Sequence, residues 1–328
     1  MAVTMAEIAA RAGVSKTTVS RVLNGKPDVD AQTAERVRAL VEQTGYVRSA
    51  SAVRLARGRT GCVGILLPSL AWPWLVEVMR GIAEELEDSQ YSGMLFTMSQ
   101  GQQALPAFTE HVSARSFDGL LAVEPPGMLG YVGSLHARGL PVVLIDDRGF
   151  HPEFPSVATT NTDGGRQAGE HLVGTGRRRI VQIAGRQSYG CVQARADGFS
   201  SGLGRAAGEG GPLTVHADFT EPSGAAAMRE LLVRVPDLDA VFAHNDLMAI
   251  GAMDVLRASG RAVPDDVAVV GFDDIDSARY VSPALTTVHQ PLYEMGRTAA
   301  RNLLEGLGGG TVADRTTLPT SLVRRESA

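Results

Sequence analysis

The chain has 328 residues, 44% of them hydrophobic, and a formal net charge of −5. This length exceeds one ordinary compact domain, and no run of about 18 apolar residues is present to cross a membrane. The N-terminus lacks the charged region and apolar stretch of a signal peptide, so we expect a cytoplasmic protein of two or three domains. Cys62 and Cys191 match no metal-binding spacing and are expected to be buried thiols.

Charge is distributed unevenly along the chain. Residues 1–60 hold 10 Lys or Arg against 5 Asp or Glu, whereas the remaining residues hold 21 against 31. A basic N-terminal segment on an acidic body is typical of a DNA-binding module tethered to another domain. A chance excess of basic residues on a solvated surface is the alternative.

Residues 4–24 predict two short helices joined at a glycine. Thr4 and Glu7 have the spacing of a capping box at the start of the first helix. Gly13 ends this helix, and Ser15 can cap the second. The apolar faces of the two helices consist of Ile8, Ala9 and Ala12, and of Val19, Val22 and Leu23. This arrangement fits a helix-turn-helix, whose second helix enters the DNA major groove.

A third helix is predicted over residues 31–43, between Asp30 and Gly45. Its apolar stripe consists of Ala34, Val37, Leu40 and Val41. Residues 1–46 would therefore form a small helical headpiece. Residues 47–60 contain four arginines and few hydrophobic residues, so they are predicted to form a hinge linker. The linker could become a short helix when phosphates neutralise its arginines.

From Cys62 onward, short apolar runs alternate with helical stretches. This alternation predicts parallel sheets that helices cover on both faces. About ten such units exceed the usual size of one sheet. We therefore expect residues 61–328 to form two similar α/β subdomains.

Polar side chains follow several of the predicted strands. In open α/β sheets, ligands bind beyond the C-terminal ends of strands. The residues at these places are Asp146 and Asp147, Asn245 and Asp246, Asp273 and Asp274, and, after the first strand, Trp72 and Trp74. Aromatic faces together with carboxylates and an amide suit a polyhydroxylated ligand such as a sugar. The alternatives are helix N-caps, favoured for Asp246 and Asp274, and core or interface positions for the tryptophans.

Motifs of catalysis or metal binding are not found. The sequence has no G-x-S-x-G, H-E-x-x-H, Walker or G-x-G-x-x-G motif. His244 and His289 lie near the predicted site but have no partner at metal-ligand spacing, and we expect hydrogen-bonded histidines. We therefore predict no enzyme activity, no metal and no cofactor. A carbohydrate-active enzyme using Asp146 and Asp273, and an extracellular sugar-binding protein, stay open as weaker alternatives.

The motifs reached so far resemble those of the lactose/galactose repressor (LacI/GalR) family. The resemblance begins with AEIAARAGVSKTTVSRVLNG and TAERVRALVEQTGY, and it continues through VPDDVAVVGFDDID, PALTTVHQP and LPTSLVRRES. It implies a homodimeric transcription regulator whose body is similar to periplasmic sugar-binding proteins. The body would consist of an N-subdomain (about 61–160 and 290–318) and a C-subdomain (about 161–289 and 319–328). The chain lacks the additional heptad helix of tetrameric relatives, so a dimer is expected.

The resemblance also implies which residues bind double-stranded operator DNA. Lys16, Thr17 and Arg21 fall where the family reads bases, and an arginine can bind guanine through both O6 and N7. Positions that mostly hold phosphates are Thr4, Ser15, Thr18, Ser20, Asn24, Thr33 and Tyr46. In the linker, Leu55 aligns with the leucine that wedges into the operator from the minor groove, beside Ala52. Ser49 stands where the family usually has Asn, and Val53 replaces a polar or arginine residue.

For the small-molecule effector, the resemblance implies contacts from Asp146, Arg195, Asn245 and Asp273, with Phe219 as an aromatic platform. Trp72 and Trp74 occupy a loop that usually reads Asn-Pro-aromatic-aromatic, and two indoles favour an oligosaccharide. The resulting hypothesis is a repressor that a sugar releases from a near-palindromic operator. The main alternative is a corepressor, such as a nucleobase, that strengthens DNA binding.

Overall fold

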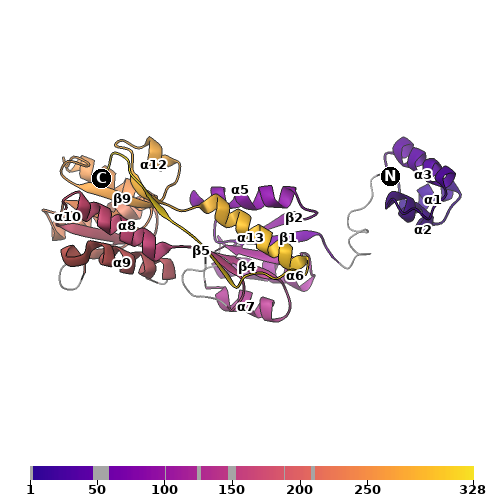
Figure 1. Cartoon of the computed structure of the whole chain (residues 1–328), viewed down its shortest axis with the longest axis horizontal. Coiled ribbons are helices and arrows are strands. Elements are labelled where there is room, and N and C mark those ends of the chain that lie inside the picture. Colours follow the sequence, from indigo (N-terminus) through magenta and orange to yellow (C-terminus); the bar gives the residue numbers. More distant parts are fainter. Residues whose placement is uncertain are drawn as a thin grey trace. The chain divides into compact units, whose positions relative to one another are not determined.

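A computed structural model describes residues 3–46, 59–99, 101–123, 127–146, 153–187, 189–207 and 211–328. The chain divides into two compact units, residues 1–60 and residues 61–328, and each is described by itself (Figure 1). Most of the predicted linker, including Ser49, Ala52, Val53 and Leu55, lies outside the described residues, as does Asp147. Within the described parts of the chain, no helix is long and apolar enough to cross a membrane.

The first unit is a three-helix headpiece of α1 (Met5–Ala12), α2 (Lys16–Leu23) and α3 (Ala31–Thr44). The predicted capping box at Thr4 and Glu7 is present, and Ser15 and Asp30 cap the next two helices. Gly13 and Gly45 end α1 and α3 in the left-handed conformation, which glycine adopts without strain. The core of this unit consists of the predicted apolar faces, with Ile8, Val19 and Val37 fully buried.

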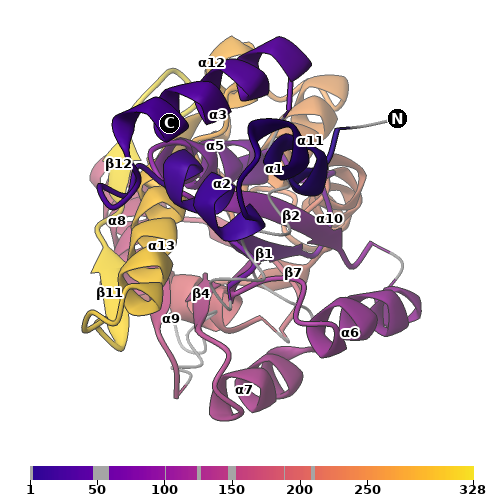
Figure 2. The same ribbon diagram turned by 90° about the vertical axis from the view of Figure 1, so that its right-hand side faces the viewer.

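The second unit contains two six-stranded sheets. The first sheet has the order β11-β5-β4-β3-β1-β2 and is parallel throughout. Its strands are β1 (Cys62–Leu67), β2 (Ser92–Thr97), β3 (Gly119–Val123), β4 (Val142–Ile145), β5 (Ser156–Thr159) and β11 (Arg315–Leu318). Helices α5 (Trp74–Glu87) and α13 (Leu292–Leu307) cover one face, and α6 (Leu105–Ser113) and α7 (Leu129–Ala137) the other (Figure 2).

The second sheet has the order β12-β10-β9-β8-β6-β7, with β12 antiparallel to its neighbour. Its strands are β6 (Ile180–Ala184), β7 (Thr214–His216), β8 (Ala240–Ala243), β9 (Ala268–Asp273), β10 (Thr286–His289) and β12 (Ser321–Val323). Helices α10 (Glu221–Arg234) and α11 (Asp246–Ala258) cover one face, and α8 (Asn161–Gly174) and α9 (Gly190–Leu203) the other. The predicted pair of parallel-sheet subdomains is confirmed.

The chain passes between the two sheets three times. The first crossing segment runs from β5 to α8, the second from β10 through Gln290 to α13, and the third from β11 through Thr320 to β12. Hydrogen bonds join the first and third segments, because the Thr160 Oγ1 accepts from the Thr320 amide at 2.8 Å. These three segments are the covalent connections between the two subdomains.

Glycines allow α8 and α9 to pack closely. A Cβ on Gly198 of α9 would lie 1.9 Å from the Thr162 carbonyl oxygen of α8, and one on Gly165 would lie 2.2 Å from the Arg195 carbonyl oxygen. Only a residue without a side chain fits such contacts. This close packing fixes the position of Arg195 on α9.

Candidate functional site

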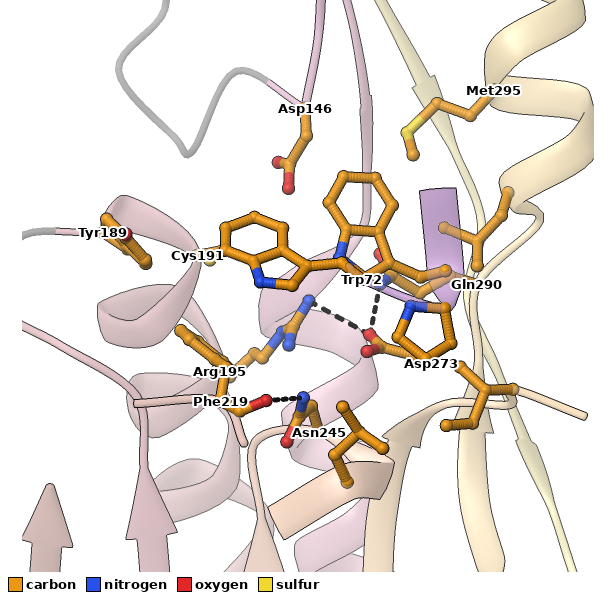
Figure 3. Close-up of a pocket in the computed structure, with 15 residues that line it drawn as sticks. Trp72, Asp146, Tyr189, Cys191, Arg195, Phe219, Asn245, Asp273, Gln290 and Met295 are labelled. Atoms are coloured by element: carbon orange, nitrogen blue, oxygen red, sulfur yellow. Dashed lines mark hydrogen bonds and ion pairs between the residues drawn. The ribbon is translucent and has the colours of Figure 1, made fainter. Parts of the chain in front are cut away.

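A pocket lies between the two sheets, at the C-terminal ends of their parallel strands (Figure 3). The space between its walls is about 590 Å³, its open mouth included. All seven residues predicted to contact the effector line it: Trp72, Trp74, Asp146, Arg195, Phe219, Asn245 and Asp273. The pocket is also lined by four residues that were not predicted to contact the effector: Tyr189, Cys191, Gln290 and Met295.

Two aromatic pairs form part of the pocket wall. Trp72 lies in the loop between β1 and α5, and Trp74 begins α5. Their ring centroids are 6.1 Å apart at an interplanar angle of 31°. Tyr189 and Phe219 belong to the second subdomain and stack at 5.8 Å and 11°. The Phe219 ring lies over Gly185, where a Cβ would be 2.1 Å from it. Both indoles are only partly buried, so ring surface is left for a ligand.

A buried charge pair forms the polar part of the pocket. Arg195 Nη2 lies 3.8 Å from Asp273 Oδ1, and both side chains are less than a tenth exposed. The Arg195 guanidinium lies 3.7 Å over the Phe272 ring, and its Nε donates to Asn161 Oδ1 at 2.8 Å. Asp273 Oδ1 accepts from Gln290 Nε2 at 2.7 Å. Charges held in this way are positioned to bind hydroxyl groups without rearranging.

Burial raises the pKa of Asp273 to about 6, while Arg195 and the hydrogen bond from Gln290 act in the opposite direction. Burial also raises the pKa of the neighbouring Asp246 well above its ordinary value, and the Asp273 charge adds to this effect. Asp246 accepts hydrogen bonds from the Thr287 hydroxyl and the Ile275 amide. Burial therefore disfavours the charged form of Asp246, which does not line the pocket, whereas Asp273 does.

The predicted N-cap roles of Asp246 and Asp274 are wrong. The cap of α11 is Asn245, whose Oδ1 accepts from the Met248 amide at 2.9 Å while its Nδ2 donates to the Phe219 carbonyl oxygen at 3.0 Å. Asp274 instead forms an ion pair with Arg325 and lies within hydrogen-bond distance of His289 Nδ1, at 3.0 Å. The partners of both aspartates come from residues distant in sequence, which a local capping rule cannot anticipate.

His244 also differs from its prediction. It is fully buried, and neither ring nitrogen has a hydrogen-bond partner within the part of the chain that the structure describes. Burial lowers its pKa well below the ordinary value, so the ring is neutral. Cys191 is buried as predicted, whereas Cys62 is partly exposed. A search of the described ranges for three or more His, Cys, Asp or Glu that could hold a metal finds none.

The headpiece presents a polar face on α2. Lys16, Thr17 and Arg21 are exposed, opposite the buried Val19 and Val22. The predicted phosphate contacts Thr4, Ser15 and Asn24 are exposed, and Thr18, Ser20, Thr33 and Tyr46 are partly exposed. Arg21 Nη1 lies 3.1 Å from Asp28 Oδ2, in an ion pair open to solvent. This face therefore offers cations and hydroxyl groups to a partner of negative charge.

Two family models match parts of the chain. Residues 4–49 match the bacterial regulatory proteins of the lacI family, and residues 170–328 match a periplasmic binding protein-like domain. The transcriptional regulator CelR of Thermobifida fusca is 37% identical, over 99% of this chain and 98% of that protein. The chain belongs to the LacI family. The predictions of family, fold class and regulatory function are confirmed, and the enzyme alternative is excluded.

Two solved structures are similar to this LacI-family chain over its whole length. The transcriptional regulator CelR–cellobiose complex is 36% identical with a TM-score of 0.75, covering 99% of this chain and 100% of that one. The Lac repressor dimer bound to operator and the anti-inducer ONPF is 28% identical with a TM-score of 0.89, covering 100% and 99%. The chain is thus a DNA-binding transcriptional regulator.

Proposed function

We propose that this regulator is a repressor that binds a near-palindromic operator as a homodimer and is released when a β-linked glucose disaccharide occupies the pocket. Sugar binding would close the two subdomains on each other and lower the affinity of the headpieces for DNA. The observation that carries the proposal is the combination of two aromatic pairs with a buried Arg195–Asp273 pair in one pocket.

The chemistry of the pocket favours this class of sugar. A β-linked glucose disaccharide is flat, with C–H groups on its two faces and hydroxyl groups around its edge. The C–H faces would stack on Trp72 and Trp74 from one subdomain and on Phe219 from the other. The edge hydroxyls would bond to Arg195 and Asp273. CelR, which has been solved with cellobiose, supports this choice and makes cellobiose the first sugar to test.

The proposed DNA contacts follow from the exposed face of the headpiece. Arg21 would bind a guanine through two hydrogen bonds, while Lys16 and Thr17 would contact neighbouring bases. The phosphate contacts would be the seven polar side chains described above, which fix the register without reading sequence. In the linker, Leu55 would wedge into the central base step beside Ala52, with Ser49 close to the backbone.

Exposed apolar side chains support the homodimer. On the first subdomain, Val76 of α5 and Leu95 of the edge strand β2 are 64% and 44% exposed. On the second, Val233 and Tyr280 are 81% and 84% exposed. A two-fold axis would let exposed apolar side chains of one protomer pack on the equivalent side chains of its partner. It would also place two headpieces on two half-sites. Sedimentation of the full chain tests this, and a monomer at micromolar concentration would contradict it.

Operator release tests the proposed function. The assay measures fluorescence anisotropy of a labelled near-palindromic site from the DNA upstream of its own gene, with and without cellobiose. The α-linked disaccharide maltose is the matched control, and hypoxanthine represents the nucleobases. We expect cellobiose alone to weaken binding about 5–150-fold, a range typical of allosteric coupling. Tighter binding with hypoxanthine would instead support a corepressor, and unchanged binding with cellobiose would reject this effector.

A further inference from the structure

Five buried residues form a closed ring that links the pocket to the crossing segments, through their side chains and the Thr159 carbonyl group. Starting at the pocket, Arg195 Nε donates to Asn161 Oδ1, and Asn161 Nδ2 lies 3.4 Å from the Thr159 carbonyl oxygen. The Thr159 hydroxyl donates to Gln290 Oε1 at 2.6 Å, and Gln290 Nε2 donates to Asp273 Oδ1 at 2.7 Å. The Arg195–Asp273 pair closes the ring. We call these five residues the hinge ring.

Some members of the hinge ring belong to the crossing segments, and others line the pocket. Thr159 ends β5 and Asn161 begins α8, so both belong to the first crossing segment, and Gln290 belongs to the second. Arg195 and Asp273 line the pocket. All five side chains are buried, so a broken bond is not readily replaced by a bond to bulk water. A shift at the pocket end therefore has to be accommodated at the crossing segments.

The closing contact of the ring has room for a ligand. At 3.8 Å, Arg195 Nη2 and Asp273 Oδ1 are too far apart for a direct hydrogen bond. Arginine has five N–H donors, and the bonds to Asn161 and to the His244 carbonyl oxygen use two of them. A ligand hydroxyl placed at this contact can accept from Arg195 and donate to Asp273. Such a hydroxyl would reposition both groups at once.

We propose that Thr159 and Gln290 are positioning residues, through which the hinge ring transmits effector binding at Arg195 and Asp273 to the crossing segments and sets how far the body closes. This inference rests on the proposed function for the effector, but the ring itself is a feature of the body alone. In this proposal the regulatory role belongs to Thr159 and Gln290, whose side chains lie at the crossing segments.

A second pair of threonines at the hinge provides a matched control. Thr160 and Thr320 join the first and third crossing segments, with their hydroxyl oxygens 2.9 Å apart. Neither residue belongs to the hinge ring or lines the pocket. Thr159→Val and Thr320→Val each replace one hydroxyl by a methyl group of similar size. The first opens the ring, whereas the second loosens the hinge and leaves the ring closed.

The first test measures effector-dependent release. Operator affinity of the full chain is measured with and without saturating cellobiose for the wild type, Thr159→Val, Thr320→Val and the rescue variant Thr159→Ser, which retains the hydroxyl. We expect all four to bind operator equally without sugar, within about twofold. The ratio of affinities with and without sugar should fall at least about fivefold in Thr159→Val only. Equal ratios for Thr159→Val and Thr320→Val would overturn the proposal.

The second test needs no effector, so it separates failure of the hinge ring from failure of the proposed function. Backbone hydrogen exchange is measured on the sugar-free wild type and both valine variants. Opening the ring frees the Gln290 side chain from Thr159, so its hydrogen bond to Asp273 is held less firmly. Exchange around residues 273–276 should therefore rise at least about threefold in Thr159→Val and stay unchanged in Thr320→Val. The same rise in both variants would contradict the ring, even if cellobiose proves not to be the effector.

Discussion

The two subdomains of the body share one strand order but contribute different chemistry to the pocket. The order β5-β4-β3-β1-β2 of the first sheet repeats as β10-β9-β8-β6-β7 in the second. The first subdomain supplies two partly exposed indoles and Asp146, whereas the second supplies the buried Arg195–Asp273 pair. One repeated topology therefore carries two indoles on one side, and a buried charge pair beside a second aromatic pair on the other.

This division gives the two surfaces different tasks. Buried polar groups discriminate strongly, because a ligand that lacks the matching hydroxyl leaves them unpaired. Aromatic faces contribute contact area and accept any ligand with a suitable flat surface. The second subdomain would thus select the sugar, and closure of the first subdomain onto the bound sugar would complete the contact. Substitutions in the two subdomains should therefore lower sugar affinity by different amounts.

Removal of the Asp273 charge should have the largest effect. Asp273→Asn keeps the size of the side chain but replaces one charged acceptor oxygen by a donor NH2 group and leaves Arg195 buried without its counter-charge. We expect cellobiose affinity to fall about 100-fold, equivalent to about 3 kcal/mol. Calorimetric titration measures it. The adjacent Asp274→Asn, outside the pocket and paired with Arg325, is the control and should bind cellobiose normally.

Loss of an indole should have an intermediate effect. Trp72→Ala removes one stacking face from the first subdomain, and the partial burial of the ring limits the loss to about 1.4 kcal/mol, or about tenfold in cellobiose affinity. Trp72→Phe should recover part of it. A loss as large as that of Asp273→Asn would erase the proposed difference between the two subdomains. Calorimetry of both variants under one set of conditions makes the comparison.

Lower pH should weaken the contribution of the second subdomain to sugar binding. Because the pKa of Asp273 is raised to about 6, its ionised fraction falls about tenfold between pH 7 and pH 5. Cellobiose affinity should fall to a similar extent, and Asp273→Asn should show a flat profile. The groups that face this carboxylate are Arg195, Asp146 and Asp246.

The same raised pKa has the opposite effect on folding. A carboxyl whose folded pKa lies above its unfolded value contributes stability that is present below pH 3.8 and is lost as the pH rises through about 6. The contribution of Asp273 to the free energy of unfolding should therefore decrease over the pH range in which sugar binding strengthens. Urea unfolding of wild type and Asp273→Asn across pH 4 to 7 checks the sign.

Loss of a solvent-exposed charge pair in the headpiece should have the smallest effect, and it should act on operator affinity. The headpiece pair Arg21–Asp28 is about half exposed, in contrast to the buried pair of the pocket. Exposed pairs contribute little, so Asp28→Asn should tighten operator binding less than about threefold, by freeing Arg21 for DNA. Operator affinity at fixed salt concentration measures it. A change of 100-fold would mean that exposure does not separate the two pairs.

Sequence patterns predicted the elements that carry strong local signals. The caps at Thr4 and Ser15 and the glycine ends of the headpiece helices follow rules that involve neighbouring residues. The central strands are continuous apolar runs. Strands β5, β10, β11 and β12 have three or four residues with threonine or serine among them, so they gave no such signal. Their pairing depends on the crossings between sheets, which arise only in the folded body.

The site residues also divide into those that a local sequence signal predicted and those that it did not. Trp72, Asp146 and Asp273 follow strands and were found by the strand-end rule, whereas Arg195 lies on α9 and came only from the family resemblance. Gln290 follows β10, so the same rule would have found it had that strand been predicted. Tyr189 precedes a helix and has no comparable signal. Their roles towards an effector stay predictions, as do those of the linker residues.

Coupling between the sugar site and the DNA site is the central claim, and reciprocity tests it most directly. Both tryptophans of the chain line the pocket, so intrinsic fluorescence reports sugar binding without a label. Cellobiose affinity is measured with and without saturating operator DNA. The account predicts that operator weakens cellobiose binding by the same factor by which cellobiose weakens operator binding. Identical cellobiose affinity in the two conditions would contradict it.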